Sequence, residues 1–223
     1  MFFSERIKSI KPDDRVLEIG PGGSPHPKAD ILLEYDFKDQ KVSEAQRGYA
    51  PELKTDKKVV FYDGTVFPFK DKEFDYVICS HVLEHVEDMD AFIAEINRVG
   101  RAGYFEYPTI YYDFVYNISE HLNFLRRHDN CIVWMPKKDT GLPAFKSVNA
   151  FFYETLEKRY NMLINELKEY FFEGFEWVGR IDSRRTCNIE ELVLHNIELP
   201  VRERRKKNFL HKLKRIFKLQ SDR

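Results

Sequence analysis

The stretch Val16-Leu17-Glu18-Ile19-Gly20-Pro21-Gly22-Gly23 decides how this chain folds. Its first four residues are typical of a short buried strand, and the strand runs directly into a glycine-rich turn. Glycine lets the backbone approach a ligand without an intervening side chain, and nucleotide-binding α/β sheets use this device after their first strand. Taken alone, the same stretch is equally consistent with an ordinary structural turn.

Short apolar runs alternate with helical or turn signals through the first half of the chain. Near-continuous apolar strands separated by helices are typical of a parallel sheet in an α/β fold. We expect strands at 16–19, 30–34, 58–62, 74–80 and 103–107 and a helix over 81–99, followed by a strand at 131–135, a helix over 148–172 and closing strands at 175–181 and 191–195.

The residues after the glycine turn argue against a dinucleotide site. Such a site wants a third glycine three residues after the second, where a helix begins and faces the pyrophosphate. Here that position is Pro25, within Ser24-Pro25-His26-Pro27, which cannot begin a normal long helix. The pattern therefore disfavours a pyrophosphate ligand.

Acidic residues follow the next two strands. Glu34 and Asp36 stand at the end of the second strand, where a carboxylate can accept both hydroxyls of a ribose. Asp63 and Gly64 follow the third strand, where an acid can accept from an adenine amine. Because the carboxyl ends of parallel strands converge on one crevice, we expect these residues to face one nucleoside.

Three segments together resemble successive motifs of class I S-adenosylmethionine-dependent methyltransferases of type 11. They are Val16–Gly23, Asp63-Gly64-Thr65-Val66-Phe67-Pro68-Phe69, and Phe74-Asp75-Tyr76-Val77-Ile78-Cys79-Ser80-His81-Val82-Leu83-Glu84-His85-Val86, within a resemblance that covers residues 12–125. The resemblance implies a Rossmann-like, seven-stranded, mostly parallel sheet with a C-terminal antiparallel hairpin, and S-adenosylmethionine as cofactor.

The same resemblance implies which residues bind the cofactor. They are Glu18, Gly20, Pro21, Gly22 and Gly23 in the first motif, Glu34 or Asp36 as the ribose acid, Asp63 and Gly64 at the adenine, and Ser80 near the methionine part. The chain departs from the family at one point. Only eleven residues separate Ile19 from Ile31, so we expect the first crossover helix to be missing or reduced to a turn. This shortening makes Asp36 a competitor of Glu34.

His81, Glu84 and His85 form the next pattern. On a helix, positions i, i+3 and i+4 share one face, and three such ligands can hold a divalent cation. Ubiquinone-pathway O-methyltransferases and small-RNA 2′-O-methyltransferases use a Glu-x-x-Glu-His version, but this chain has His at the first position. We therefore favour the interpretation in which Glu84 and His85 make local hydrogen bonds and no metal binds.

Three side chains are candidates for catalysis. His121 follows the fifth strand, where methyltransferases of this fold place substrate groups, and an imidazole can take a proton from a hydroxyl near neutral pH. Glu106, at the end of the fifth strand, is the rival base, and His81 is the third candidate. A lone histidine is more often structural, so this assignment is a hypothesis.

The net charge of −1 hides a division of the chain. Residues 202–223 contain ten Lys/Arg and two acidic residues, a net +8, which leaves −9 on the rest. Within 209–219 the apolar residues share one arc, so this tail is a predicted basic amphipathic helix that binds an anionic membrane, a partner or its own domain. We expect a methyltransferase domain at 1–200, with a cofactor half at 12–109 and a closing half at 110–200, and a tail at 201–223.

The composition excludes several other classes of protein. Three cysteines without a Cys-x-x-Cys spacing favour free thiols in a reducing compartment, and no apolar run reaches the length of a membrane span. We expect a cytoplasmic protein, with peripheral attachment to the inner membrane face through 202–219 as an option. The acidic body carries no recognisable nucleic-acid module.

The sequence thus predicts an S-adenosylmethionine-dependent methyltransferase acting on a small molecule or a glycan, including a surface-polysaccharide intermediate. O-methylation is the first choice, because the chain has no Asn-Pro-Pro-Tyr type motif for binding an amine. Two alternatives stay open: a non-catalytic partner subunit that binds the cofactor, and a NAD-dependent sugar-modifying enzyme, which Pro25 disfavours. The identity of the acceptor, metal dependence and oligomeric state are not encoded in these motifs.

Overall fold

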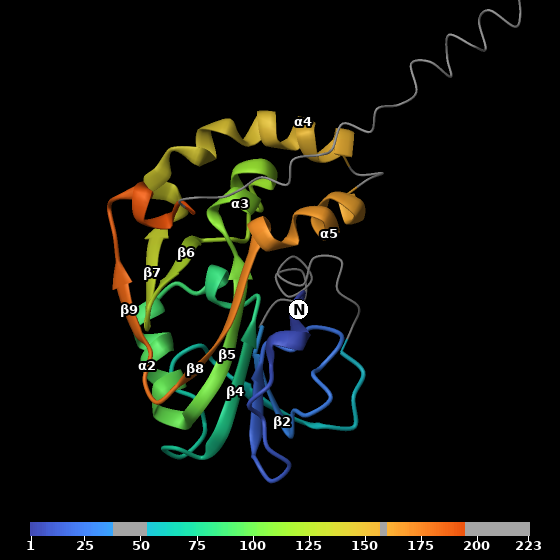
Figure 1. Cartoon of the computed structure of the whole chain (residues 1–223), viewed down its shortest axis with the longest axis vertical. Coiled ribbons are helices and arrows are strands. Elements are labelled where there is room, and N and C mark those ends of the chain that lie inside the picture. The colour runs from blue at the N-terminus through green and yellow to red at the C-terminus, as the bar shows by residue number, and fades with distance from the viewer. Residues whose placement is uncertain (38–52, 157–159, 195–223) are drawn as a thin grey trace, which may run out of the picture. The chain divides into compact units, whose positions relative to one another are not determined.

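The computed structural model describes residues 1–37, 53–156 and 160–194. Its central element is a six-stranded sheet in the order β3-β2-β1-β4-β5-β8 (Figure 1). The first five strands are parallel and β8 is antiparallel to β5. They span Val16–Ile19 (β1), Ile31–Tyr35 (β2), Lys58–Tyr62 (β3), Phe74–Ser80 (β4), Gly100–Pro108 (β5) and Phe172–Val178 (β8).

Successive side chains of β1 pack into different apolar clusters on the two faces of the sheet. Leu17 and Ile19 pack with the helix α2 (Met89–Val99) in the main core. Their neighbour Val16 points the other way and packs with Ile10 of the N-terminal segment. The period of two that places these residues is the one expected for a strand buried on both faces. The N-terminal segment thus covers a face that a crossover helix would otherwise cover.

The connection from β1 to β2 contains no such helix. Residues 20–30, all of which the structure describes, form turns and extended backbone only. The expectation of a missing first crossover helix is confirmed, and the prolines at 21, 25 and 27 are its local cause.

The helix expected over 81–99 is shorter than predicted. Residues Leu83–His85 form a separate 3₁₀ turn, η2, and α2 begins only at Met89, where the Asp88 carboxylate accepts a hydrogen bond from Ala91 N. His81 precedes both with a left-handed backbone, at a φ of 56°. His81, Glu84 and His85 therefore do not lie on one helix face, contrary to the prediction.

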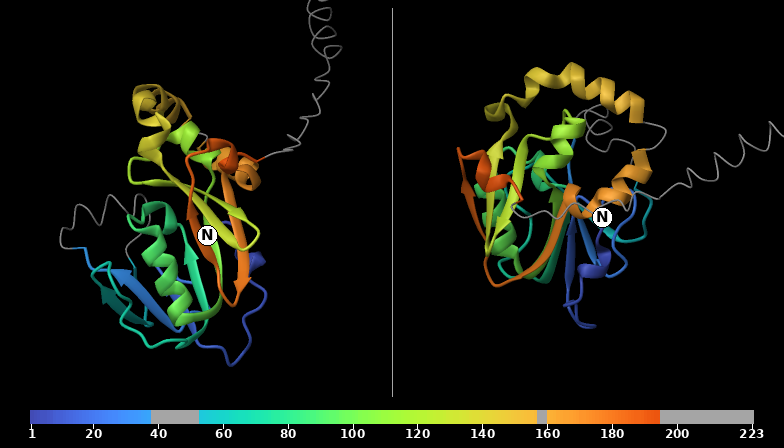
Figure 2. Two further views of the ribbon diagram at one scale, coloured as in Figure 1. Left: turned by 90° about the vertical axis from the view of Figure 1, so that its left-hand side faces the viewer. Right: turned by 45° about the horizontal axis from the view of Figure 1, so that its top comes forward.

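A second, three-stranded sheet replaces the predicted C-terminal hairpin. It contains β6 (Asn123–His128), β7 (Cys131–Pro136) and β9 (Asp182–Arg185), and β9 is parallel to β7 (Figure 2). The prediction of seven strands in one sheet is corrected to six among the described residues. After β8 the chain turns at Gly179, and Asp182 N donates to Asn130 O, so the last strand extends the β6–β7 hairpin instead of the main sheet.

Two further expectations from the second half need correction. The predicted helix over 148–172 is two helices, α4 (Lys146–Leu156) and α5 (Tyr160–Phe171). The predicted strand over 191–195 is a 3₁₀ turn, η6 (Ile189–Leu192). The remaining helical elements are η1 (Ser4–Arg6), α3 (Ile110–Tyr116), η3 (Lys137–Thr140) and η4 (Leu142–Phe145).

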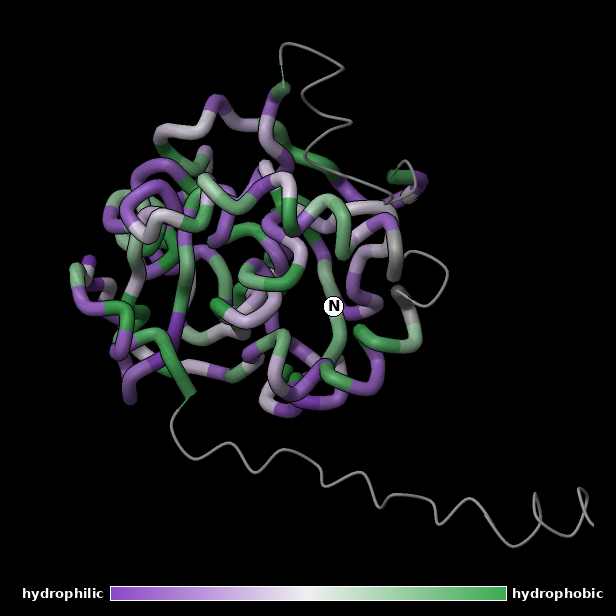
Figure 3. Tube along the Cα trace, turned by 90° about the horizontal axis from the view of Figure 1, so that it is seen from above, coloured by the Kyte–Doolittle hydropathy of each residue, from purple (hydrophilic) through white to green (hydrophobic). Residues whose placement is uncertain are grey.

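The apolar stretches of the described chain are short, and Figure 3 shows them interrupted by hydrophilic residues. Within the part that the structure describes, no helix is long and apolar enough to cross a membrane. Residues 1–193 form one compact unit. The predicted boundary near residue 200 and the basic tail at 201–223 lie outside the described residues, so both stay predictions.

Candidate functional site

The glycine turn (Gly20–Gly23) lies where the sequence places it, at the carboxyl end of β1. Gly20 has a φ of 60°, and a Cβ atom there would lie 2.5 Å from Val82 Cγ2. Gly22 also has a positive φ, 58°, but a Cβ there would meet no atom within 4 Å. Gly20 is therefore required by packing, whereas Gly22 keeps the backbone accessible from open space. Pro21 is buried, and Gly23 is half-buried.

Glu18 holds this turn from inside. Its carboxylate is 4% exposed and accepts a hydrogen bond from His26 N, with Oε2 2.6 Å from the nitrogen. Burial raises the pKa of Glu18 to about 7, against the lowering effect of the His26 hydrogen bond. Glu18 thus holds the loop that follows the glycine turn in place through its hydrogen bond with His26 N.

The predicted nucleoside acids come together at the next two strand ends. Asp36 and Asp63 line one surface cavity of about 370 Å³, together with Phe61, Tyr62, Thr65, Val66 and Pro68. Asp63 Oδ1 accepts hydrogen bonds from the backbone N–H and the hydroxyl of Thr65. Glu34, two residues before Asp36, is buried in β2 and pairs with Phe61 of β3. Gly64 lies against the Tyr35 ring. The cavity thus includes Asp36, the competitor for the ribose, and not Glu34.

Glu106 and His81, both candidates for catalysis, contact each other. His81 Nε2 lies 2.9 Å from Glu106 Oε1. The fully buried Glu106 carboxylate also accepts from Phe2 N, Phe3 N and the Tyr104 hydroxyl, and the Ser80 hydroxyl lies 3.4 Å away. Burial would raise the pKa of Glu106, but the hydrogen bonds and the His81 charge lower it to about 2. A carboxylate held so firmly in its charged form is a weak base.

His81 is held between two carboxylates. Its Nδ1 lies 3.4 Å from Glu84 Oε1 and its Nε2 faces Glu106. Burial lowers the pKa of an imidazole, but these two acids outweigh burial and raise the pKa of His81. Both ring nitrogens are thus engaged, which favours a positioning role for His81.

His121 lies on the loop between α3 and β6, backed by a carboxylate from α3. Its Nδ1 is 2.8 Å from Asp113 Oδ2, and Lys137 Nζ is 3.1 Å from Asp113 Oδ1. All three side chains are buried. Because a carboxylate only accepts, the Nδ1 of His121 carries the hydrogen and its Nε2 is directed elsewhere. Both ring nitrogens of His81 face carboxylates, whereas the Nε2 of His121 is outside the pair that His121 forms with Asp113.

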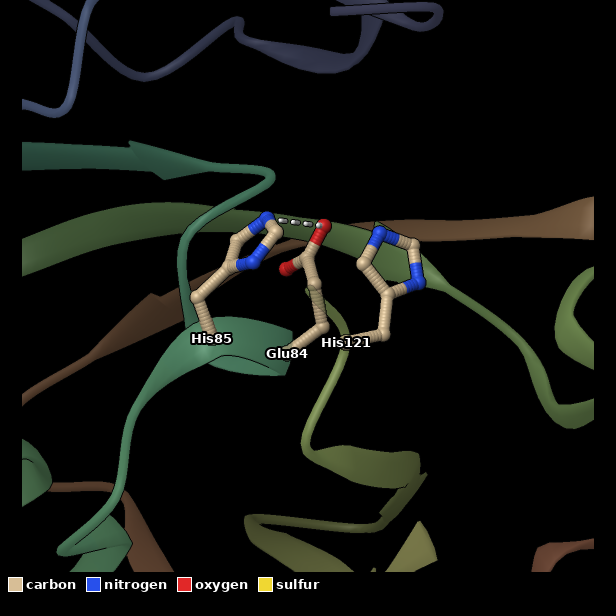
Figure 4. A group of neighbouring side chains, drawn as sticks. All are labelled: Glu84, His85 and His121. Atoms are coloured by element: carbon tan, nitrogen blue, oxygen red, sulfur yellow. Dashed lines mark ion pairs between the residues drawn. The ribbon is translucent and has the colours of Figure 1, made fainter. Parts of the chain in front are cut away.

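His121 belongs to a group that we call the histidine cluster, formed by Glu84, His85 and His121 (Figure 4). One ligand atom from each residue lies within 4.8 Å of the others. This group differs from the trio of His81, Glu84 and His85 considered from the sequence, because it contains His121, 36 positions after His85, and not His81.

Sequence reasoning missed several residues of this region. Val82 closes over Gly20, and Asp113 and Lys137 orient His121. None of them belongs to a motif, because each acts across a contact between segments distant in the chain. The spacing of eight residues between Asp113 and His121 carries no signal unless the end of α3 is known.

The sequence of the central sheet matches a known family. Residues 17–105 match the family model described as a methyltransferase domain, of type 11, which is less than half of the chain. No curated protein matches the sequence.

Solved structures offer further similarities. An S-adenosylmethionine-dependent methyltransferase from Thermotoga maritima is 22% identical over 48% of this chain and 49% of its own, with a TM-score of 0.33. One from Mesorhizobium loti is 15% identical over 73% and 89%, with a TM-score of 0.39, and one from Methanosarcina mazei is 19% identical over 54% and 69%, with a TM-score of 0.33. The chain spans about half the length of the Thermotoga structure.

The family match covers the glycine turn, both acidic strand ends and β4, which are the segments that carry the predicted motifs. Residues 17–105 are therefore similar to a methyltransferase domain of type 11.

Proposed function

We propose that this chain transfers a methyl group from S-adenosylmethionine to a hydroxyl of a small molecule or a glycan intermediate. The family match of residues 17–105 supports the cofactor and the transfer. At the level of atoms, the proposal rests on the cavity after β2 and β3, which the carboxylates Asp36 and Asp63 from successive strand ends line. When bound, the cofactor supplies a methyl group already activated on a sulfonium.

The residues present fit a nucleoside that carries no polyphosphate. Asp36 and Asp63 put negative charge at the cavity, which suits hydroxyl and amine donors and repels phosphates. The open space above Gly22 lets the ligand reach the backbone directly. We assign Asp36 to the ribose hydroxyls, Asp63 to the adenine amine and the Gly20–Gly23 backbone to the methionine end.

The acceptor side of the site is assigned to the histidine cluster. Val82, which closes over Gly20, is only two residues from Glu84, so the glycine turn and the cluster are neighbours. Methyl transfer from a sulfonium needs alignment, exclusion of water and removal of the acceptor's proton. Because Glu106 and His81 are paired with each other, we place the loss of that proton at the cluster, where His121 was the predicted base.

The choice of a glycan or lipid-linked acceptor rests on the sequence of the tail. Residues 202–219 are basic and, over 209–219, amphipathic, which supports peripheral attachment to an anionic membrane surface. This segment lies outside the described residues, and the acceptor and the attachment are proposals from sequence alone.

Isothermal calorimetry with S-adenosylmethionine tests the core of the proposal. We expect one site, with S-adenosylhomocysteine competing and NAD not competing. Asp63→Asn should weaken binding at least about tenfold, the loss of one charge-assisted contact. The matched control Asp71→Asn, an exposed acid paired with Arg98 outside the cavity, should leave it unchanged. Absence of binding by the wild type would refute the proposal.

A screen of metabolite and glycan extracts for transferred methyl label tests turnover. Labelled product on oxygen is the expected result. Cofactor binding without transfer to any acceptor would indicate the non-catalytic partner subunit, and NAD competition would favour the sugar-modifying enzyme.

A further inference from the structure

Glu84 is a buried carboxylate whose oxygens accept no hydrogen bond from the described residues. Its side chain is 1% exposed, and neither carboxylate oxygen makes a hydrogen bond within the described part of the chain. Its contacts with His81 Nδ1 at 3.4 Å and His85 Nε2 at 4.0 Å are ion-pair distances only. Burying a carboxylate that has these longer contacts but no hydrogen bond is costly, so its state indicates a ligand that completes its surroundings.

Two imidazoles aim at this carboxylate from opposite sides (Figure 4). His85 Nδ1 lies 2.9 Å from Glu120 O, and a carbonyl oxygen accepts hydrogen bonds but never donates them. Nδ1 therefore carries the hydrogen, and the Nε2 of a neutral His85 presents a lone pair toward Glu84. His121 has the same arrangement, with Asp113 as the acceptor at Nδ1. A histidine with Nδ1 bound to a carbonyl or carboxylate is in the form that binds metals through Nε2.

The backbone keeps the three side chains together. Leu122 N donates to Glu84 O at 2.7 Å, and with the contact of His85 to Glu120 O this joins the loop of His121 to η2. Lys137 holds Asp113 behind His121. The cluster is thus built from two segments, η2 and the loop that carries His121, which are joined independently of the ligand atoms.

The size of the cluster fits a small cation. The ligand atoms now lie within 4.8 Å of one another. First-row divalent cations bind histidine nitrogen and carboxylate oxygen at about 2.0–2.2 Å, which brings neighbouring ligand atoms to roughly 3 Å. Binding therefore requires the three side chains to move closer together. Two imidazoles and one carboxylate suit a transition-metal ion better than Mg²⁺ or Ca²⁺, which prefer oxygen ligands.

We propose that Glu84, His85 and His121 bind one first-row divalent transition-metal ion, with Zn²⁺ and Co²⁺ as the probes. His81 is outside the site because its Nε2 is engaged by Glu106. Three protein ligands leave coordination positions open for water or for the hydroxyl of an acceptor, whose pKa the cation lowers. His121 is then a ligand, and the cation, in place of a free imidazole, makes the acceptor's proton easier to lose.

Metal binding to the untagged full chain tests this proposal. After removal of metal with a chelator, Co²⁺ should bind at one equivalent by calorimetry and give a visible absorption band, which Zn²⁺ then removes. Glu84→Gln and His121→Asn should each weaken Co²⁺ binding at least about a hundredfold. The control His128→Asn, an exposed histidine bound to Glu191 O outside the cluster, should bind Co²⁺ as the wild type does.

Folding of the variants is checked separately. Circular dichroism should be unchanged, and saturating Zn²⁺ should raise the melting temperature of the wild type and of His128→Asn but not of Glu84→Gln. No Co²⁺ binding by the wild type, or equal binding by folded Glu84→Gln, would overturn the proposal. Because these measurements need neither cofactor nor acceptor, their outcome is distinct from that of the proposed function.

Discussion

Glu18 and Glu84 are both buried carboxylates close to the carboxyl edge of the sheet, 4% and 1% exposed, but their surroundings differ. Glu18 accepts a hydrogen bond from the backbone of its own loop, eight residues away, and burial raises its pKa to about 7. Glu84 lies among imidazoles, and although burial would raise its pKa, the neighbouring histidines lower it. The first carboxylate supports a loop from within, whereas the second keeps its charge and faces side chains from a distant segment.

This difference separates two parts of the site. The glycine turn and its acids depend on local backbone geometry, and the histidine cluster depends on contacts between segments. Changes in one part should leave the ligand of the other part bound.

Gly20→Val should have the largest effect. Its Cβ would collide with Val82 at 2.5 Å, and a β-branched residue is strained at a φ of 60°. We expect loss of detectable S-adenosylmethionine binding and a lower melting temperature, measured by calorimetry and thermal unfolding. Gly22→Ala is the matched control, because its Cβ meets no atom within 4 Å. This variant should lose only about 1 kcal/mol of stability, from the left-handed backbone. It should weaken S-adenosylmethionine binding less than Gly20→Val does. Unaltered binding by both variants would contradict the placement of the cofactor.

Replacing the acid that binds the ribose should have the second-largest effect on cofactor binding. Asp36 lines the cavity and Glu34 is buried in β2. Asp36→Asn should therefore weaken S-adenosylmethionine binding about tenfold in calorimetry, while Glu34→Gln should change the melting temperature more than the affinity. The reverse ranking would restore Glu34 as the ribose acid. Co²⁺ binding should be the same in both variants.

Glu18→Gln should change the pH dependence of stability. With a folded pKa of about 7 against the ordinary 4.5, the folded state retains the Glu18 proton more strongly than the unfolded state does. Stability from this group is fully present below pH 4.5 and is lost as the pH rises to about 7, by on the order of 3 kcal/mol. The variant should lack this loss in urea unfolding followed from pH 4.5 to 8, and an unchanged pH slope would show that the shift is absent.

Ser80→Ala should have the smallest effect. The Ser80 hydroxyl makes a long hydrogen bond of 3.4 Å to Glu106, a carboxylate with several other donors. We expect less than about 1 kcal/mol of lost stability. A tenfold loss of cofactor affinity by calorimetry would instead show that the hydroxyl contacts the methionine part, as the resemblance implies.

Local patterns in the sequence determined the parallel strands of the central sheet and the place of the glycine turn and Asp63. The strands at 16–19, 58–62 and 74–80 were predicted with their observed bounds, because an apolar run ended by glycine, proline or acidic residues acts within a few residues. The glycine turn and Asp63 directly follow strands, so the parallel order of the sheet was enough to bring them to one edge.

Only the tertiary structure decided the histidine cluster and the last strand. β9 pairs with β7 across about 50 residues, and His121 reaches Glu84 because Leu122 N binds Glu84 O. Asp113 becomes the partner of His121 only once α3 has placed it. Such contacts depend on where whole segments lie, and the spacing of residues along the chain carries no record of that placement. The same physical reason explains why the spacing groups His81, a neighbour in sequence, with Glu84 and His85, whereas His121, a neighbour in space, has a ligand atom within 4.8 Å of theirs.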